Sequence, residues 1–155
     1  MKKQKGFSLI ELLIVVAIIL IIAAIAIPNL LKSRMAANES SAVGSIRTLN
    51  TAEVTYASGC PNVGFSATIA ELNTGAVCAG GTGIIDNVLA TGVKSGYTFA
   101  YAAVATVGIN TTYTTSAVPQ KVGVTGQRGF YSDQTGVIRY TLNGSVPTNA
   151  ASALQ

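Results

Sequence analysis

The sequence predicts an α+β protein in which a long N-terminal helix is followed by a small head of antiparallel strands. Two regions indicate this fold. Residues 7–56 are compatible with one helix, apolar on every side in its first half and on one side in its second half. Residues 97–142 contain runs of β-branched and aromatic residues separated by turn residues. The 155 residues are enough for one such head and too few for two comfortable domains.

The apolar run at residues 7–27 is interrupted only by Ser8 and Glu11. As a helix rising about 1.5 Å per residue, it would be roughly 31 Å long, which matches the hydrocarbon core of a bilayer. Three lysines precede the run and favour a cytoplasmic N-terminus, although Lys32 and Arg34 follow it.

Pro28 ends the apolar run, and residues 29–56 remain compatible with a helix. Because proline removes a hydrogen bond and clashes with the preceding turn, we expect a kink or local melting at Pro28. Beyond it an apolar stripe recurs every seven residues and is widened by two more positions. Its members are Met35, Ala42, Leu49 and Tyr56, with Leu31 and Ile46 beside them. Most charged residues, Glu39 and Glu53 among them, are expected to lie off this stripe, with the carboxylates in water.

The head is expected to begin with a glycine-rich, loop-rich region from Ala57. Short helices are predicted at residues 66–72, with Ser66 as a possible cap, and at 84–90. A C-terminal tail from Asn143 is expected to be loose. Four strands are predicted, at residues 97–107, 111–118, 127–132 and 136–142, with turns at Gly108–Asn110 and Asp133–Gly136.

The charge of the chain is low and unevenly placed. Only 10% of the residues are charged and 49% are hydrophobic, against about 25% charged in an average soluble domain. This composition suggests a membrane, a tight assembly or an extracellular coat of hydroxyl and amide groups. The net charge of +4 includes Lys2, Lys3 and Lys5; without them, seven basic side chains face six acidic ones. The remaining basic residues are scattered, which argues against nucleic acid as a primary partner.

Cys60 and Cys78 are the only cysteines, and histidine is absent. An even pair after an apolar N-terminal segment indicates a disulfide in an oxidising compartment, the alternative being two free thiols in a cytosolic protein. Two cysteines without further ligands do not make a zinc site. Without histidine, neither a Ser-His-Asp nor a Cys-His arrangement is possible. We therefore expect no enzyme activity, no cofactor and no metal.

Two ordinary explanations of the N-terminus leave Glu11 unexplained. A secretory signal peptide could be cleaved after Ala26, releasing a soluble binding module, but the apolar run is too long for one. A simple single-span anchor tolerates the length. However, an ionised acid costs on the order of 2–3 kcal/mol at the bilayer centre and is rarely retained without a partner.

A third interpretation supplies that partner. The segment Lys5-Gly6-Phe7-Ser8-Leu9-Ile10-Glu11-Leu12-Leu13 closely resembles the class III signal of type IV prepilins and pseudopilins. The resemblance covers roughly residues 2–56. It implies cleavage between Gly6 and Phe7 by a prepilin peptidase, N-methylation of Phe7, and an ion pair between the new Phe7 amino group and Glu11 of a neighbouring subunit. It also implies that the precursor lies in the inner membrane and that its assembly machinery builds a helical homopolymer, an extracellular pilus.

The resemblance extends to the head, where the family packs the outer half of the helix on an antiparallel sheet. Cys60 and Cys78 follow the long helix, whereas many pilins have a disulfide across the C-terminal strands. A major pilin serving adhesion, twitching motility or DNA uptake is favoured; the alternatives are a type II secretion pseudopilin and a minor pilin. The expected organisation is a cleaved leader at 1–6, a membrane and filament-core helix at 7–28, an amphipathic helix at 29–56 and a globular head at 57–155.

Overall fold

The computed structural model describes residues 7–74 and 83–154. The chain divides into two compact units, residues 1–34 and 35–155, which are described separately. The longest element, helix α1, extends over Leu9–Gly59 and belongs to both. It continues through Pro28 without a break, so there is no local melting at this position; the kink remains a prediction.

In the first unit, the described residues form the apolar part of α1. Its large side chains are exposed within the single chain, from 75% at Leu9 to 46% at Val16, and Phe7 just before the helix is 81% exposed. Helix α1 is long and apolar enough to cross a membrane, judged by length and composition alone. Because apolar surface is unfavourable in water, this segment requires lipid or protein around it.

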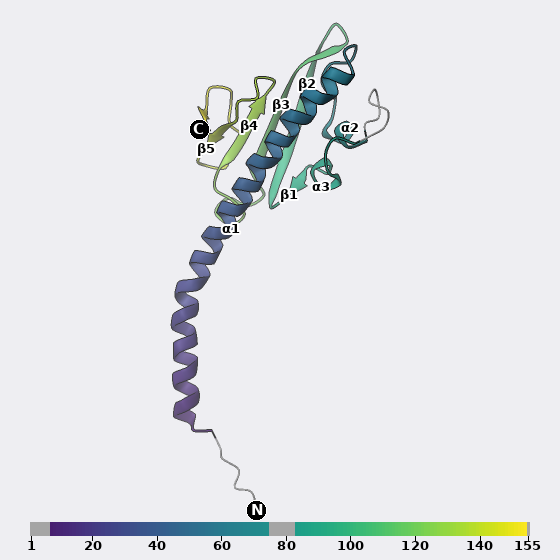
Figure 1. The fold of residues 1–155 in the computed structure, drawn as a ribbon. Coiled ribbons are helices and arrows are strands. Elements are labelled where there is room, and N and C mark those ends of the chain that lie inside the picture. The colour runs from purple at the N-terminus through teal and green to yellow at the C-terminus, as the bar shows by residue number, and fades with distance from the viewer. Residues whose placement is uncertain (1–6, 75–82, 155) are drawn as a thin grey trace, which may run out of the picture. The chain divides into compact units, whose positions relative to one another are not determined.

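The second unit contains a sheet of six antiparallel strands arranged in the order of the chain (Figure 1). Two short helices, α2 (Ile69–Thr74) and α3 (Asn87–Ala90), lie between α1 and the sheet in sequence. The strands are β1 (Val93–Lys94), β2 (Tyr97–Thr106), β3 (Ile109–Pro119), β4 (Gly129–Asp133), β5 (Arg139–Thr141) and β6 (Ser152–Ala153).

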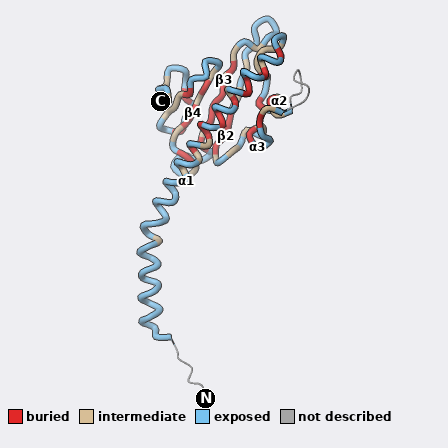
Figure 2. Tube along the Cα trace, viewed as in Figure 1, coloured by how far each residue is buried: buried red, intermediate tan, exposed pale blue. Residues whose placement is uncertain are grey.

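The core lies between the outer half of α1 and one face of the sheet. Side chains alternate between the two faces of a strand, and Tyr97 and Phe99 of β2 are buried while Thr98 and Ala100 are exposed. Figure 2 shows the buried residues along this helix and the strands beside it. Of the predicted stripe, Ala42, Ile46, Leu49 and Tyr56 are at most 1% exposed and form the packing face, whereas Met35 is only partly buried and Leu31 is 48% exposed.

The structure confirms the predicted α+β fold, but a turn, a helix start and the C-terminal tail differ from the expectations. The β2–β3 turn is at Val107–Gly108, because Ile109 and Asn110 already pair with β2. Helix α2 begins after Ser66, which is therefore not its cap. The tail is less loose than expected, since β6 pairs with β5 and Leu154 packs against the core.

Candidate functional site

The N-terminus of α1 is closed by its own side chains. Ser8 immediately precedes the helix; its hydroxyl oxygen accepts a hydrogen bond from the backbone N–H of Ile10 at 3.3 Å. Glu11 Oε2 accepts one from the backbone N–H of Ser8 at 2.9 Å. This reciprocal arrangement resembles a capping box, with the Ser8 hydroxyl bonded to Ile10 rather than to the backbone N–H of Glu11. Glu11 thus has a hydrogen-bond partner within its own chain, in addition to the partner expected from a neighbouring subunit.

Glu11 lies in the first turn of α1. Backbone N–H groups at a helix N-terminus carry partial positive charge, which stabilises a nearby carboxylate. Beyond Glu11, the described residues as far as Leu31 contain no other acidic group and are almost entirely apolar. One carboxylate therefore lies at the start of the exposed apolar part of α1, and no second acid follows it as far as Leu31.

A second carboxylate, Glu39, lies in the outer half of α1 and is 7% exposed. Its Oε1 accepts hydrogen bonds from the backbone N–H groups of Gln127 and Arg128 at 2.8 and 3.1 Å. Its Oε2 accepts one from Arg128 Nε at 2.7 Å. Burial acts to raise the pKa of Glu39, but these donors and the Arg128 charge outweigh it, so the pKa lies below its ordinary value. Glu39 therefore connects α1 to the loop before β4 as a charged group.

A third carboxylate, Glu53, is completely buried. It accepts hydrogen bonds from the backbone N–H of Ser66 at 3.0 Å and from its hydroxyl at 2.5 Å. The Tyr101 hydroxyl donates to the Ser66 carbonyl at 2.9 Å. Burial raises the pKa of the Glu53 carboxyl above its ordinary value, although the Ser66 donors oppose that shift. Burial likewise raises the pKa of the neighbouring Tyr101 hydroxyl.

The expectation that Glu39 and Glu53 lie in water was wrong. Glu39, Ile46 and Glu53 recur every seven residues, and Ile46 belongs to the buried stripe. That spacing was the signal which could have placed both acids on the packed face. Their burial is possible because each carboxylate meets donors from the loops that cover the helix.

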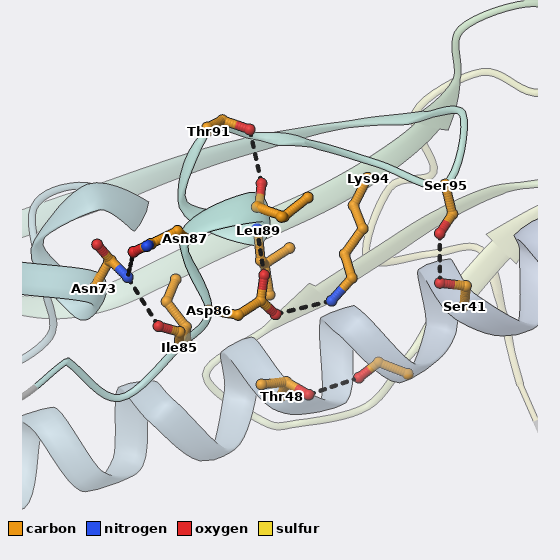
Figure 3. A network of polar contacts seen from close by, with 12 residues as sticks. Ser41, Thr48, Asn73, Ile85, Asp86, Asn87, Leu89, Thr91, Lys94 and Ser95 are labelled. Carbon is orange, nitrogen blue, oxygen red and sulfur yellow. Dashed lines mark hydrogen bonds and ion pairs between the residues drawn. The ribbon is translucent and has the colours of Figure 1, made fainter.

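Several hydroxyl groups on the outward side of the same helix bond to the helix itself. Four consecutive hydroxyl side chains along it bond back to carbonyl oxygens of α1 itself, as Figure 3 shows for Thr48. A hydroxyl bonded in this way leaves its carbonyl partner and itself satisfied without water. The bonds, at 2.7–3.1 Å, join Thr48 to Gly44, Thr51 to Arg47, Thr55 to Thr51 and Ser58 to Val54.

Comparisons with known proteins agree with the N-terminal geometry. The family model of the prokaryotic N-terminal methylation motif matches residues 1–27. The N-terminal segment of the chain is similar to that of type IV pilins. It is 62% identical over 40 residues to the type IV wide pilus major component PilA4 of Thermus thermophilus, covering 26% of this chain and 30% of that protein. No solved structure matches the chain significantly.

Two further pilin relatives show the same restricted coverage. The type IV major pilin protein PilA of Myxococcus xanthus is 48% identical over 54 residues, which are 35% of this chain and 24% of that protein. A fimbrial protein of Pseudomonas aeruginosa is 54% identical over 52 residues, 34% of each chain. The matches thus span about a third or less of these relatives.

The remaining predicted site residues are only partly within the described structure. Phe7 is described and exposed, whereas Gly6 lies outside the described residues, so the cleavage site stays a prediction. Cys60 is buried in the core at the end of α1. Cys78 lies outside the described residues, so its predicted pairing with Cys60 also stays a prediction. Within residues 7–74 and 83–154, no group of three or more acidic or cysteine side chains could bind a metal ion.

Proposed function

We propose that this chain is a major pilin, a structural subunit that polymerises through α1 into a type IV pilus. The observation that carries the proposal is the single carboxylate, Glu11, at the start of an exposed apolar helix. Such a helix is stable in a bilayer before assembly and among the helices of other copies afterwards, because both surroundings cover its apolar surface. Moving from lipid to protein then exposes little of that surface to water.

Processing would provide the partner for Glu11. A prepilin peptidase cleaves between Gly6 and Phe7, removing the lysines of the leader and creating an amino group at Phe7, which is then methylated. In an apolar environment, this cation attracts the Glu11 carboxylate of a neighbouring copy far more strongly than it would in water. The ion pair favours one axial offset between subunits, since at other offsets both charges would lie unpaired in an apolar environment.

The outward face of α1 supports helix packing as well. The back-bonded hydroxyls of Thr48, Thr51 and Thr55 need no water, so a neighbouring helix can cover this face without leaving them unpaired. The proposed route therefore begins in the inner membrane, passes through the assembly machinery there and ends in an extracellular filament. Adhesion, twitching motility and DNA uptake are the roles of such a filament that we propose.

A comparison of two substitutions separates the charge of Glu11 from its capping. Glu11→Gln keeps a carbonyl oxygen for the Ser8 N–H but removes the charge, whereas Glu11→Ala removes both. We expect both variants to be processed and both to lose filaments, as measured by electron microscopy of sheared surface material. The matched control Ser8→Ala removes the other half of the capping box and is expected to keep filaments.

Two results would contradict the proposal. Normal filaments from Glu11→Gln would show that the charge is unnecessary for assembly. N-terminal sequencing of the exported chain should find methylated Phe7 first. A chain that retains its first six residues, or begins at residue 27, would exclude a processed pilin.

A further inference from the structure

A hollow of about 420 Å³ lies beside the outer half of α1, between the helix, the start of β4 and the end of the chain. Ser40, Gly44 and Arg47 line it from α1, Arg128 from the loop before β4, and Leu154 from the residue after β6. We call this group the arginine hollow. It contains the guanidinium groups of Arg47 and Arg128. Of these two groups, only the Nε of Arg128 takes part in the contacts described above, where it donates to Glu39.

The Arg128 guanidinium is fixed in position with donors to spare. Its Nε donates to Glu39 at 2.7 Å, and its central carbon lies 5.6 Å from the ring centroid of Phe130 and 5.8 Å from that of Tyr140. Stacking on aromatic rings and an ion pair both orient a guanidinium. Its two terminal nitrogens donate to no atom in the described part of the chain. They are therefore available to a ligand without further ordering of the side chain.

Two other polar side chains that line the arginine hollow have no hydrogen-bond partner in the described part of the chain. Among residues 7–74 and 83–154, the Arg47 side chain takes part in no ion pair or hydrogen bond, and the Ser40 hydroxyl in no hydrogen bond. Glu39 is the acidic residue of the lining, and both its oxygens already accept hydrogen bonds. The lining therefore has one more positive than negative charge. Guanidinium and hydroxyl donors without an internal acceptor suit an oxyanion.

Gly44 has no evident role in the packing of this chain. A methyl group built at its α-carbon would meet no atom within 4 Å, and its φ is not positive. Glycine within a helix is less stable than alanine by roughly 0.5–1 kcal/mol. The fold therefore does not require glycine here, and its missing side chain enlarges the arginine hollow.

We propose that the arginine hollow binds an oxyanion, a phosphate or a carboxylate group, through Arg47, the terminal nitrogens of Arg128 and the Ser40 hydroxyl. The group belongs either to a free solute or to an acidic side chain of a second copy. The first source is independent of filament formation. The second rests on the proposed pilin function. The site itself is tested by binding, without reference to filaments.

The binding test uses the full chain in detergent micelles, with inorganic phosphate and acetate as separate probes in calorimetric titrations. We expect saturable binding of at least one probe, weakened at least tenfold by Arg47→Gln. Lys121→Gln is the matched control, because Lys121 is an exposed cation outside the lining and its loss removes the same charge. Arg47 is chosen over Arg128 because Arg128 also neutralises Glu39, so its loss could disturb the fold.

A second variant separates binding from stability. Gly44→Ala meets no obstacle in the chain and favours the helix, so its unfolding temperature should equal or exceed that of the wild type. Its methyl group narrows the arginine hollow, and binding of the probe should weaken. Unchanged probe affinity in both Arg47→Gln and Gly44→Ala, or equal losses in Arg47→Gln and Lys121→Gln, would overturn the proposal. So would the absence of saturable binding by both probes.

The source of the oxyanion is identified by sedimentation of the same protein at increasing concentration. If a second copy supplies it, the wild type self-associates, and both phosphate and Arg47→Gln reduce that association. If a free solute supplies it, phosphate binds and Arg47→Gln abolishes the binding, while association is the same in both proteins. Either pattern supports the site. If Glu11→Gln loses filaments but still binds phosphate, the substitution has affected assembly and not the oxyanion site.

Discussion

The buried contact between Glu53 and Ser66 allows a quantitative test of the head. Glu53→Ala removes the acceptor of two hydrogen bonds and leaves a buried N–H and a buried hydroxyl to find other partners. Hydrogen bonds to a charged group contribute about 1.5–3 kcal/mol each, so the two together contribute about 3–6 kcal/mol. Burying the Glu53 carboxylate also costs free energy, and the same burial raises its pKa. Removing the carboxylate removes this cost, which offsets part of the loss. We expect a net loss of about 2–4 kcal/mol in the free energy of unfolding.

The assay is thermal unfolding of the full chain in detergent, followed by near-ultraviolet circular dichroism of the tyrosines. Tyr56, Tyr97 and Tyr113 lie in the core, so this signal reports the head rather than the apolar half of α1. At about 4 °C per kcal/mol, the expected loss lowers the unfolding temperature by roughly 8–16 °C. Val54→Ala is the matched control, because Val54 is the next residue of α1 and is 60% exposed. Equal unfolding temperatures in the two variants would refute the assigned role of Glu53.

The pH dependence tests the same contact without removing the side chain. Because the folded-state pKa of Glu53 is raised above 4.5, folding favours its protonated form. The part of its contribution that depends on protonation is thus fully present below pH 4.5 and is lost as the pH rises through the folded-state pKa. Glu53→Gln cannot ionise, so its unfolding temperature relative to the wild type should increase from pH 4.5 upward. A difference that stays constant across that range would contradict the assigned pKa shift.

Two other predictions concern the connections between α1 and the head. Glu39→Ala leaves Arg128 without its carboxylate partner and should cost about 2–4 kcal/mol of stability, measured by the same thermal unfolding. Because the pKa of Glu39 is lowered, its stabilisation is present above pH 4.5 and should disappear as the pH falls through its folded-state value. If Cys60 and Cys78 pair, alkylation without reductant should add no mass, and reduction should cost roughly 3 kcal/mol. Labelling of both cysteines before reduction would exclude the disulfide.

Much of this protein could be predicted from the sequence because the relevant patterns are local. The helix in the outer half of α1 follows from a seven-residue recurrence, and its members Ala42, Leu49 and Tyr56 are buried as predicted. The strands follow from β-branched and aromatic runs between turn residues, and β2 begins at the predicted residue, Tyr97. The position of Glu11 was likewise evident, because one acid in a long apolar run is conspicuous without any structure.

The environment of the two head carboxylates required the tertiary structure. Glu39 bonds to the backbone of residues 127 and 128, which are 88 and 89 positions away in the sequence. Glu53 is satisfied by Ser66, whose local sequence instead suggested a helix cap. A charge on a helix face is stable either in water or beside buried donors, and residue spacing cannot distinguish these two surroundings.

By itself, the sequence determined that an apolar helix begins with one acidic residue, and that a head of antiparallel strands follows. Both properties depend on side chains a few residues apart, whose spacing defines the face they occupy. Only the tertiary structure decided which acids are buried, and that Gly44 lies beside an open hollow with two arginines. These properties depend on segments brought together by folding, and the free energy of each polar group is set by the neighbours it meets there.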